Sequence, residues 1–281
     1  MNAPTRRRDT LGIACGAAAA AVMAAFVLLA VFLLGEARSV ANPAFLLDAP
    51  SRAADRAGVG PALAGTLWLA MLTAALALPI GIGTAIYLEE YASRNRLAAL
   101  VGSALAGLTG VPSVVYGVAG LALFVRGLGM GPSILAGGCT LAVLALPTVI
   151  VTSRVAIRAV PEEMRLAAYS LGATRWQVVR GEVLPAAAPG IVAGSCHALT
   201  RTIGEAAPLL VLGAAAFMTF APHGPGDPLT SLPTRIFAWT TRSEQDFAAL
   251  AAGAGIALLL VLLLVNLAAL AVRRRMRGGA R

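Results

Sequence analysis

The chain has 281 residues and a formal net charge of +9, with 58% apolar and only 12% charged residues. That balance excludes an ordinary soluble domain, because water is not the main solvent for so apolar a sequence. All 22 residues in the lysine-plus-arginine count are arginine, which excludes the lysine of a phosphate-binding P-loop and any lysine Schiff base. The excess of arginine is typical of cytoplasmic loops in a membrane protein, so we expect lipid and no nucleic acid as a partner.

The cysteine and histidine content does not support a metal or redox centre. Cys15, Cys139 and Cys196 all lie in long apolar stretches, the chain has two histidines, and no Cys-x-x-Cys pair occurs. This pattern predicts neither a disulfide framework nor a metal cluster. We therefore expect the chain itself to bind no metal and no cofactor.

Six segments are long and apolar enough to cross a bilayer. The hydrocarbon core is about 30 Å thick, so roughly 20 uncharged apolar residues in a helix can span it. Helices are expected because a backbone in lipid must satisfy its own hydrogen bonds. We predict an all-α membrane protein with six transmembrane helices, over residues 11–34, 57–88, 97–125, 127–153, 183–200 with a continuation that carries Arg201 and Glu205, and 247–272.

These spans divide the chain into three parts. Residues 1–56 are expected to form an N-terminal cytoplasmic arm, the first transmembrane helix and an outside loop. Residues 57–272 form the main transmembrane domain, including a cytoplasmic loop at 159–185, and residues 273–281 form a basic cytoplasmic tail.

The first span and the arginine distribution give the orientation. Arg6, Arg7 and Arg8 precede this span as they would precede a signal peptide, but its apolar run exceeds the about 7–15 residues of a signal core. We therefore expect an uncleaved anchor. With both termini inside, fifteen arginines lie in cytoplasmic segments and six lie outside, while Arg201 falls within the membrane. This bias predicts that both termini are cytoplasmic.

Proline and glycine interrupt three of the spans. Transporter helices often break where irregular backbone lines a cavity, whereas a single proline in a helix is as readily explained by a packing kink. The sequence leaves both interpretations open. The interruptions are at Pro79, Gly81 and Gly83, at Gly110 and Pro112, and at Pro147.

The loop between the fourth and fifth spans predicts a helical hairpin. Pro161 suits the start of a first helix, and Glu162 and Glu163 then lie in its first turn, where the helix dipole favours anions. Gly172 is expected to end this helix. Its expected apolar stripe consists of Met164, Ala168 and Leu171.

The second helix of the hairpin has clear boundary signals. Thr174 followed by Gln177 is a capping box, and Pro185 is expected to stop the helix. An amphipathic hairpin of this kind either lies on lipid or inserts into a groove on a partner protein.

This hairpin resembles the coupling loop of ABC-importer permeases, whose pattern is Glu-Ala-Ala, three residues, Gly, nine residues, Ile-x-Leu-Pro. Two positions depart from the pattern, since Leu166 stands in place of the Glu and Glu182 in place of the Ile. In the family that first Glu often contacts the ATPase, and Glu162 and Glu163 are the acidic residues nearby. The residues that match are Ala167, Ala168, Gly172, Leu184 and Pro185.

Three further segments are similar to the permease subunits of phosphate importers, in the family of binding-protein-dependent transport system inner-membrane components. They read LALPIGIGTAIYLEEYA at 76–92, LTGVPSVVYGVAGLALF at 108–124 and RTIGEAAPLL at 201–210. The resemblance extends from about Thr66 to the end of the sixth span. It implies a non-enzymatic permease of the bacterial inner membrane, which forms half of a phosphate pathway by alternating access.

The same resemblance implies the partners. They are a homologous second permease subunit, a dimeric cytoplasmic ABC ATPase that binds ATP and Mg²⁺, and an extracytoplasmic phosphate-binding protein. Two alternatives remain open at this point. One is the same architecture serving molybdate, sulfate or phosphonate, and the other is a standalone secondary transporter.

Arg201 and Glu205 are the candidate substrate-pathway residues. An arginine at membrane depth costs roughly 2.5–3.5 kcal/mol on insertion scales, so it invites a functional explanation. Its guanidinium fork suits a tetrahedral oxyanion, and Glu205, four residues further along a helix, would lie on the same face and orient the fork. The alternative is a structural ion pair. The hydroxyls of Ser113, Tyr116 and Thr202 are further candidate oxyanion ligands or ordinary packing groups.

The segment from Thr219 to Asp246 is the longest loop expected outside the membrane. The resemblance implies that it docks a binding protein, and the alternative is a solvated connector.

Overall fold

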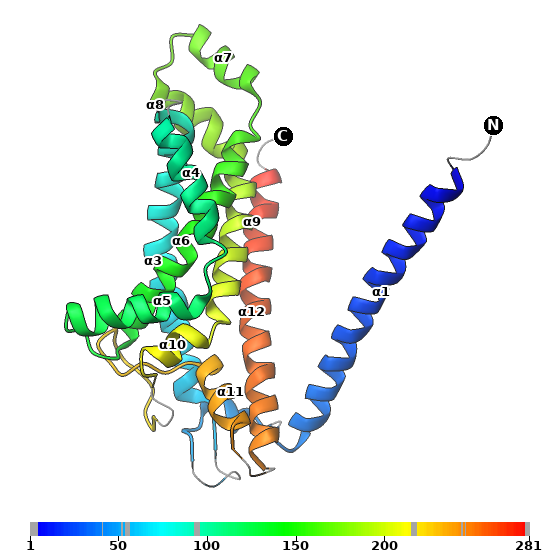
Figure 1. Cartoon of the computed structure of the whole chain (residues 1–281), viewed down its shortest axis with the longest axis vertical. Coiled ribbons are helices and arrows are strands. Elements are labelled where there is room, and N and C mark those ends of the chain that lie inside the picture. The colour runs from blue at the N-terminus through cyan, green and yellow to red at the C-terminus, as the bar shows by residue number, and fades with distance from the viewer. Residues whose placement is uncertain are drawn as a thin grey trace.

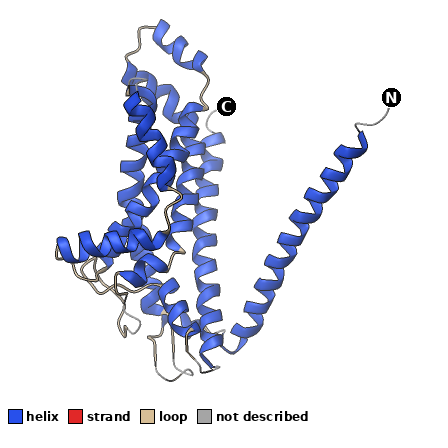
Figure 2. Ribbon diagram, viewed as in Figure 1, coloured by secondary structure: helices blue, strands red, loops and turns tan. Residues whose placement is uncertain are grey.

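The computed structural model describes residues 5–40, 42–51, 53, 57–92, 96–214, 218–242, 244 and 246–278. Regular structure in these residues is helical (Figure 1, Figure 2), apart from an antiparallel bridge between Ser133 and Pro228. Parts of the expected N-terminal arm and outside loop, and the last three residues of the basic tail, lie outside the described residues.

Five long helices contain most of the described residues, and shorter helical segments connect them. The long helices are α1 (Thr5–Glu36), α3 (Gly60–Ile86), α6 (Ile134–Arg158), α9 (Leu184–Ile203) and α12 (Asp246–Gly278). The shorter α-helices are α2 (Pro43–Leu47), α4 (Arg96–Leu108), α5 (Ser113–Gly120), α7 (Glu162–Ser170), α8 (Arg175–Val178), α10 (Ala207–Val211) and α11 (Leu232–Thr240). A 3₁₀ turn, η1 (Ala37–Val40), and three π-helical turns, η3 (Tyr87–Tyr91), η4 (Leu121–Gly127) and η5 (Val179–Val183), complete the order.

The helical lengths agree with six spans of which one is broken. Five helical stretches of the described chain are long and apolar enough to cross a membrane: 12–36, 60–91, 134–158, 175–203 and 246–276. The sixth candidate consists of α4 and of α5 with η4, which are bent by 99° at their junction. Gly110 and Pro112 lie in this junction, so this interruption is a true break of the span. The all-α prediction is confirmed.

One expected helix boundary is wrong. Pro185 does not end the second helix of the cytoplasmic hairpin, because α8, η5 and α9 continue without interruption from Arg175 to Ile203. Pro185 lies in the first turn of α9, directly after the π-helical turn η5. A proline is tolerated there because the local change in hydrogen-bond register removes the need for its missing N–H.

Small residues let the central helices approach closely. The most extensive contacts join α3 to α6 and α6 to α9, and α6 is the most buried of the candidate spans. A Cβ added to Gly81 would lie 2.6 Å from a methyl carbon of Val149, and one added to Gly138 would lie 2.8 Å from Cβ of Leu72. Such close contacts replace the hydrophobic effect as the cohesive force between helices in lipid.

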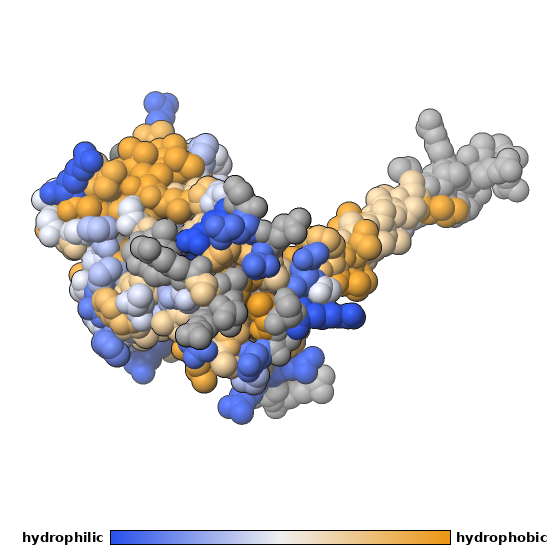
Figure 3. All heavy atoms as spheres, turned by 90° about the horizontal axis from the view of Figure 1, so that it is seen from below, coloured by the Kyte–Doolittle hydropathy of each residue, from blue (hydrophilic) through white to orange (hydrophobic). Residues whose placement is uncertain are grey.

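Helix α1 stands apart from the rest of the bundle. It contacts η1 and α12 near its C-terminal end and then diverges from α12 (Figure 1). Its apolar window is entirely exposed, including Ile13, Phe26 and Leu28. In the view from the end opposite α7, the apolar side chains of α1 extend beyond a bundle end scattered with hydrophilic residues (Figure 3).

The described ends of the chain lie at the same end of the bundle. The start of α1 and the end of α12 both lie at the end that carries α7 and α8 (Figure 1). An even number of crossings requires this arrangement. The basic end of α12, from Arg273 to Arg275, therefore lies on the side of the expected cytoplasmic hairpin.

Replacing Gly117 with Ala should destabilise the bundle. A Cβ at Gly117 of α5 would lie 2.7 Å from the Cα of Pro208 in α10, and overpacking of this kind costs about 1–3 kcal/mol. We expect the thermal unfolding midpoint of the purified chain in detergent to fall by several degrees. The control is Gly107→Ala, where a Cβ meets nothing within 4 Å. Equal midpoints for the two variants would show that α5 does not need this close approach.

Candidate functional site

Two broken helices lie against each other in the bundle. Helix α4 ends at Leu108 and α5 begins at Ser113, while α9 ends at Ile203 and α10 begins at Ala207. Helices α5 and α10 are in extensive contact, centred on the close approach of Gly117 to Pro208. Irregular backbone at membrane depth is tolerated where protein buries it or a cavity adjoins it, and paired half-helices often surround substrate sites in transporters.

A small cavity lies where the two breaks meet. Its volume is about 10 Å³, which is close to the minimum for one water molecule. Apolar and hydroxyl side chains from α4 and α6 form one side, and a cation and a carboxylate from the α9–α10 region form the other. The lining residues are Leu108, Thr109, Leu144, Thr148, Arg201, Thr202 and Glu205.

Glu205 is tied to the start of α5. Its Oε2 atom accepts a hydrogen bond from the Ser113 hydroxyl at 2.9 Å, and its backbone N–H donates to the Thr202 carbonyl at 3.2 Å. The carboxylate is half-buried. This contact joins the two breaks, because Ser113 is the first residue of α5 and Glu205 lies between α9 and α10.

Arg201 has no polar partner among the described residues. It lies in the last turn of α9 and is exposed. The prediction that Arg201 and Glu205 lie on one face of a helix is wrong, because α9 ends at Ile203 and Glu205 follows the helix. The two residues nevertheless line the same cavity. Arg201 therefore presents an unpaired guanidinium group beside a carboxylate that Ser113 already holds.

The three candidate hydroxyls all donate to protein acceptors. Ser113 donates to Glu205, Tyr116 donates to the carbonyl of Leu108 at 2.9 Å, and Thr202 donates to the carbonyl of Ala198 at 2.8 Å. The Tyr116 bond satisfies one of the carbonyls that the end of α4 leaves without a helical partner. No group of three or more His, Cys, Asp or Glu in the described parts of the chain is placed to hold a metal ion.

The hairpin between α6 and α9 forms with the first-helix start and the capping box that the sequence predicts. Glu162 and Glu163 lie in the first turn of α7 and are exposed. The capping box is present: the Thr174 N–H donates to Oε1 of Gln177 at 2.7 Å, and the Gln177 N–H donates to Oγ1 of Thr174 at 3.4 Å. Gly172 links α7 to this cap with a φ of +81°, a conformation that favours glycine.

The hairpin has one face toward the bundle and one toward water. Ala168 packs against a cluster that includes Ile157, Val178 and Val183, whereas Ala167 is exposed. Leu171, expected in the same stripe as Ala168, is instead 89% exposed, because it follows the last residue of α7. Other large apolar residues on the outer face are Met164, Leu166, Tyr169 and Trp176. Within α9, Leu184 is half-buried and Pro185 is exposed.

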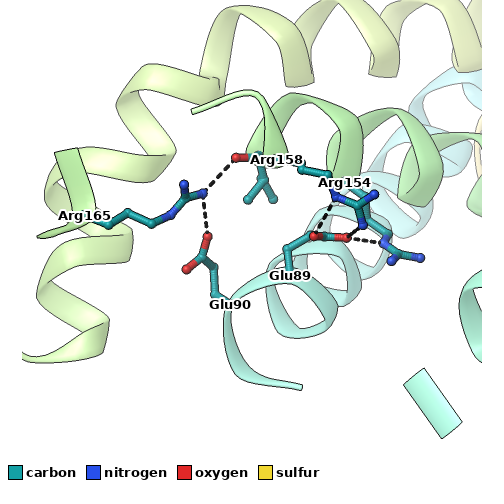
Figure 4. A network of polar contacts seen from close by, with 6 residues as sticks. Glu89, Glu90, Arg154, Arg158 and Arg165 are labelled. Atoms are coloured by element: carbon teal, nitrogen blue, oxygen red, sulfur yellow. Dashed lines mark hydrogen bonds and ion pairs between the residues drawn. The ribbon is translucent and has the colours of Figure 1, made fainter. Parts of the chain in front are cut away.

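Sequence reasoning missed a charged network that anchors this hairpin (Figure 4). In its first half, the Glu89 carboxylate at the end of α3 accepts two guanidinium groups from α6. Arg154 Nε donates to Glu89 Oε1 at 2.7 Å, and Arg158 donates through Nη2 at 2.8 Å and through Nε at 3.2 Å. The signal in the sequence was the i, i+4 spacing of the two arginines, which places both on one face of a helix.

In its second half, the network reaches the hairpin itself. Arg165 of α7 donates to Glu90 Oε1 at 3.0 Å and to the carbonyls of Val160 at 2.7 Å and Ile157 at 2.9 Å. The Ile157 carbonyl lies in the last turn of α6 and that of Val160 lies just after it, at a helix end that leaves acceptors unpaired and favours cations. Glu90 retains only 8% side-chain exposure. Arg165 thus fixes α7 to the ends of both α3 and α6.

The loop at the opposite end of the bundle has a fixed structure. The Asp227 carboxylate accepts the backbone N–H groups of His223 at 2.6 Å and Gly224 at 3.0 Å, and these bonds hold the pKa of Asp227 below its ordinary value of 3.8. The N–H of Ile134 donates to the Asp227 carbonyl at 2.9 Å. The loop is therefore pinned to the start of α6.

Comparisons with known proteins agree on one family. Residues 77–278 match the family described as "Binding-protein-dependent transport system inner membrane component". The phosphate transport system permease protein PstA 1 of Mycobacterium tuberculosis is 36% identical over 77% of this chain and 70% of its own length. The phosphate transport system permease protein PstC 2 of Mycobacterium bovis is 33% identical over 74% of each chain.

Solved structures support the fold. A chain from a bacterial ABC transporter involved in the import of the acidic polysaccharide alginate superposes with a TM-score of 0.63 over 96% of both chains, at 17% identity. At that identity the likeness concerns the fold alone.

Replacing Arg165 with Gln should loosen α7. The substitution removes one ion pair and two bonds to the end of α6, and hydrogen bonds to charged groups contribute about 1.5–3 kcal/mol each. We expect amide hydrogen exchange across α7 to accelerate at least about tenfold, because local opening governs that rate. Arg180→Gln is the matched control, since Arg180 is exposed on the adjoining segment. Unchanged exchange in the Arg165 variant would contradict an anchoring role.

Proposed function

The chain belongs to the family of binding-protein-dependent transport system inner membrane components, and on that premise we propose that the ABC importer it serves carries inorganic phosphate. As a member of this family it is a multi-pass, non-catalytic permease subunit that works with an ATPase and a binding protein. ATP and Mg²⁺ belong to the ATPase. The proposal for phosphate is supported above all by an unpaired arginine beside the cavity at two helix breaks, together with relatives named for phosphate transport.

Arg201 would contact the substrate directly. A guanidinium group matches the geometry of a tetrahedral oxyanion through two parallel N–H donors. Arg201 has these donors available, because no described residue of the chain accepts from it. Glu205 would hold the local charge near neutral when the site is empty and would favour release, because its carboxylate competes with the anion. The half-helix α5, which begins beside Glu205, would add its N-terminal dipole to the site.

The second half of the pathway would come from a homologous permease subunit. Arg201 lines the small cavity and is exposed to the surroundings of the chain. The apolar surface of α1 is exposed in this chain, and a neighbouring subunit of similar fold would cover part of it. The extracytoplasmic phosphate-binding protein would dock at the opposite end, over the loop that Asp227 orders.

Coupling to a dimeric ATPase would occur through the hairpin at the cytoplasmic end. This proposal is supported by the resemblance of the hairpin to the coupling loop of the family, which Ala167, Ala168, Gly172, Leu184 and Pro185 carry. Glu162 and Glu163 supply exposed carboxylates at its tip, and the exposed apolar residues around Leu171 supply a surface for an ATPase groove. The network around Arg165 would carry the resulting displacement into α3 and α6, and so drive alternating access.

Two alternatives make different predictions. An importer of the same fold for molybdate, sulfate or phosphonate would show uptake that these anions inhibit more strongly than phosphate does. A secondary transporter would move its substrate along an ion gradient without any ATPase.

Replacing Arg201 with Gln should abolish most phosphate uptake. The assay uses proteoliposomes that contain the permease pair and the ATPase, with ATP inside and the binding protein loaded with ³²P-phosphate outside. We expect ATP-dependent uptake by the unmodified complex and a loss of about tenfold or more in the variant, because charged hydrogen bonds to the anion are removed.

The matched control for this assay is Arg126→Gln, which removes an exposed arginine from η4. Uptake by the Arg201 variant that equals uptake by the control would remove Arg201 from the pathway. Uptake without the ATPase would favour the secondary-transporter alternative.

Replacing Leu171 with Asp should weaken ATPase assembly without unfolding the hairpin. The side chain is almost fully exposed, so its loss leaves internal packing intact while a charge enters the proposed docking surface. We expect ATPase retained on the purified complex to fall about tenfold, since interface anchors typically contribute 2 kcal/mol or more. Leu128→Asp, an exposed leucine far from the hairpin in sequence, is the control. Full retention of ATPase by the Leu171 variant would refute this docking surface.

A further inference from the structure

A second and larger cavity lies between α4 and α6, closer to the end that carries the hairpin. Its volume is about 370 Å³, within the about 300–1,000 Å³ typical of small-molecule sites. Gly102, Ser103 and Ala106 of α4 face Arg154, Val155 and Arg158 of α6 across it. The cavity is open to the surroundings of the protein, and two of its seven lining residues are cationic.

The charges around this cavity do not cancel. Glu89 is the acidic partner of both Arg154 and Arg158, so this group of three residues retains one positive charge. Arg154 is only 19% exposed and Glu89 only 12% exposed. A partly buried net cation raises the affinity of a neighbouring cavity for anions, because the low dielectric around it screens the charge weakly.

Arg154 also has donors to spare. Its single hydrogen bond within the described chain runs from Nε to Glu89, which leaves both terminal nitrogens, with four N–H groups, for another acceptor. A Cβ on Gly102 would lie 2.8 Å from Nη1 of Arg154. The glycine therefore lets the guanidinium group lie against the α4 backbone at the cavity wall, with its outer edge available to a ligand.

The position of the cavity narrows the possible ligands. Arg154 is four residues before the end of α6, about 6 Å along the helix. Basic pockets between transmembrane helices on the cytoplasmic side bind anionic headgroups. The smaller cavity of Arg201 also borders α4 and α6, through Leu108 and Thr148, so the two cavities follow one another along the same pair of helices.

We propose that the cavity between α4 and α6 binds a phosphate group, which Arg154 holds through its two terminal nitrogens while Arg158 lies at the mouth. Arginine pairs with phosphate oxygens in this bidentate manner. The phosphate group is either that of an anionic lipid or inorganic phosphate that has passed Arg201. The second source rests on the proposed function, whereas the first does not.

The test measures binding to the purified full-length chain in phosphatidylcholine nanodiscs. One arm adds ³²P-phosphate at equilibrium, and the other includes phosphatidylglycerol and counts retained lipid by native mass spectrometry. We expect one of these probes to bind at one Arg154-dependent site per chain, where binding is about tenfold weaker in Arg154→Gln. Ala106→Phe should weaken binding equally, because the ring fills the cavity while the contacts of Glu89 remain intact.

Two control variants separate this site from the pathway site. Arg126→Gln should leave the binding of both probes unchanged, since Arg126 does not line the cavity, whereas Arg201→Gln should remove only the ³²P-phosphate that is bound at the pathway site. Retention of phosphatidylglycerol that depends on Arg154 supports the lipid source, even if the chain transports no phosphate. Saturable ³²P-phosphate binding that depends on Arg154 but not on Arg201 supports the inorganic source. Binding of neither probe, or equal binding by the Arg154 and Ala106 variants and the unmodified chain, overturns the proposal.

Discussion

The structure depends on how the chain satisfies its backbone where two helices break at membrane depth. A broken helix leaves carbonyl and N–H groups without partners, and lipid offers no replacement. Here the break after Leu108 is closed by the Tyr116 hydroxyl and by local turns, and Glu205 bonds Ser113 across to the second break. Residues at each helix break thus contact residues at the other. The close packing of Gly117 in α5 on Pro208 in α10 holds the two breaks together. This mutual support explains why a charged residue and irregular backbone occur in the same place.

Much of the fold was accessible from the sequence because apolar runs bounded by charges approximate membrane spans. The predicted ends of the spans were wrong where a helix continues through charged residues that have ion-pair partners. The fourth span was expected to end at Ser153, yet α6 continues to Arg158, because Glu89 pairs with the arginines that ended the apolar run. The same span was expected to begin directly after Arg126, but α6 begins at Ile134. Ser133 caps this helix start, because its hydroxyl accepts the Ala136 N–H.

The candidate site was only partly accessible. The positions of Gly110 and Pro112 indicated an interruption but not its 99° bend, since proline and glycine permit a range of angles that packing then selects. The i, i+4 relation of Arg201 to Glu205 assumed a continuous helix, and Gly204 ends that helix between them. Local capping signals, such as Thr174 with Gln177, proved reliable because they act within four residues. The Glu90 to Arg165 pair joins residues 75 positions apart, and no local pattern encodes it.

Helix α6 connects the Asp227 loop, both cavities and the hairpin of the described chain. Its first residue is pinned by the outer loop through Asp227, its middle borders the Arg201 cavity through Leu144 and Thr148, and its last two turns carry Arg154 and Arg158. Arg165 then ties its terminal carbonyls to the hairpin. A well-packed helix transmits displacement along its axis because its interior neighbours resist deformation. A shift of the hairpin would therefore reach the cavity at the two breaks through α6 directly, and the same shift would change the width of the larger cavity between α4 and α6. The two cavities would then respond to one motion.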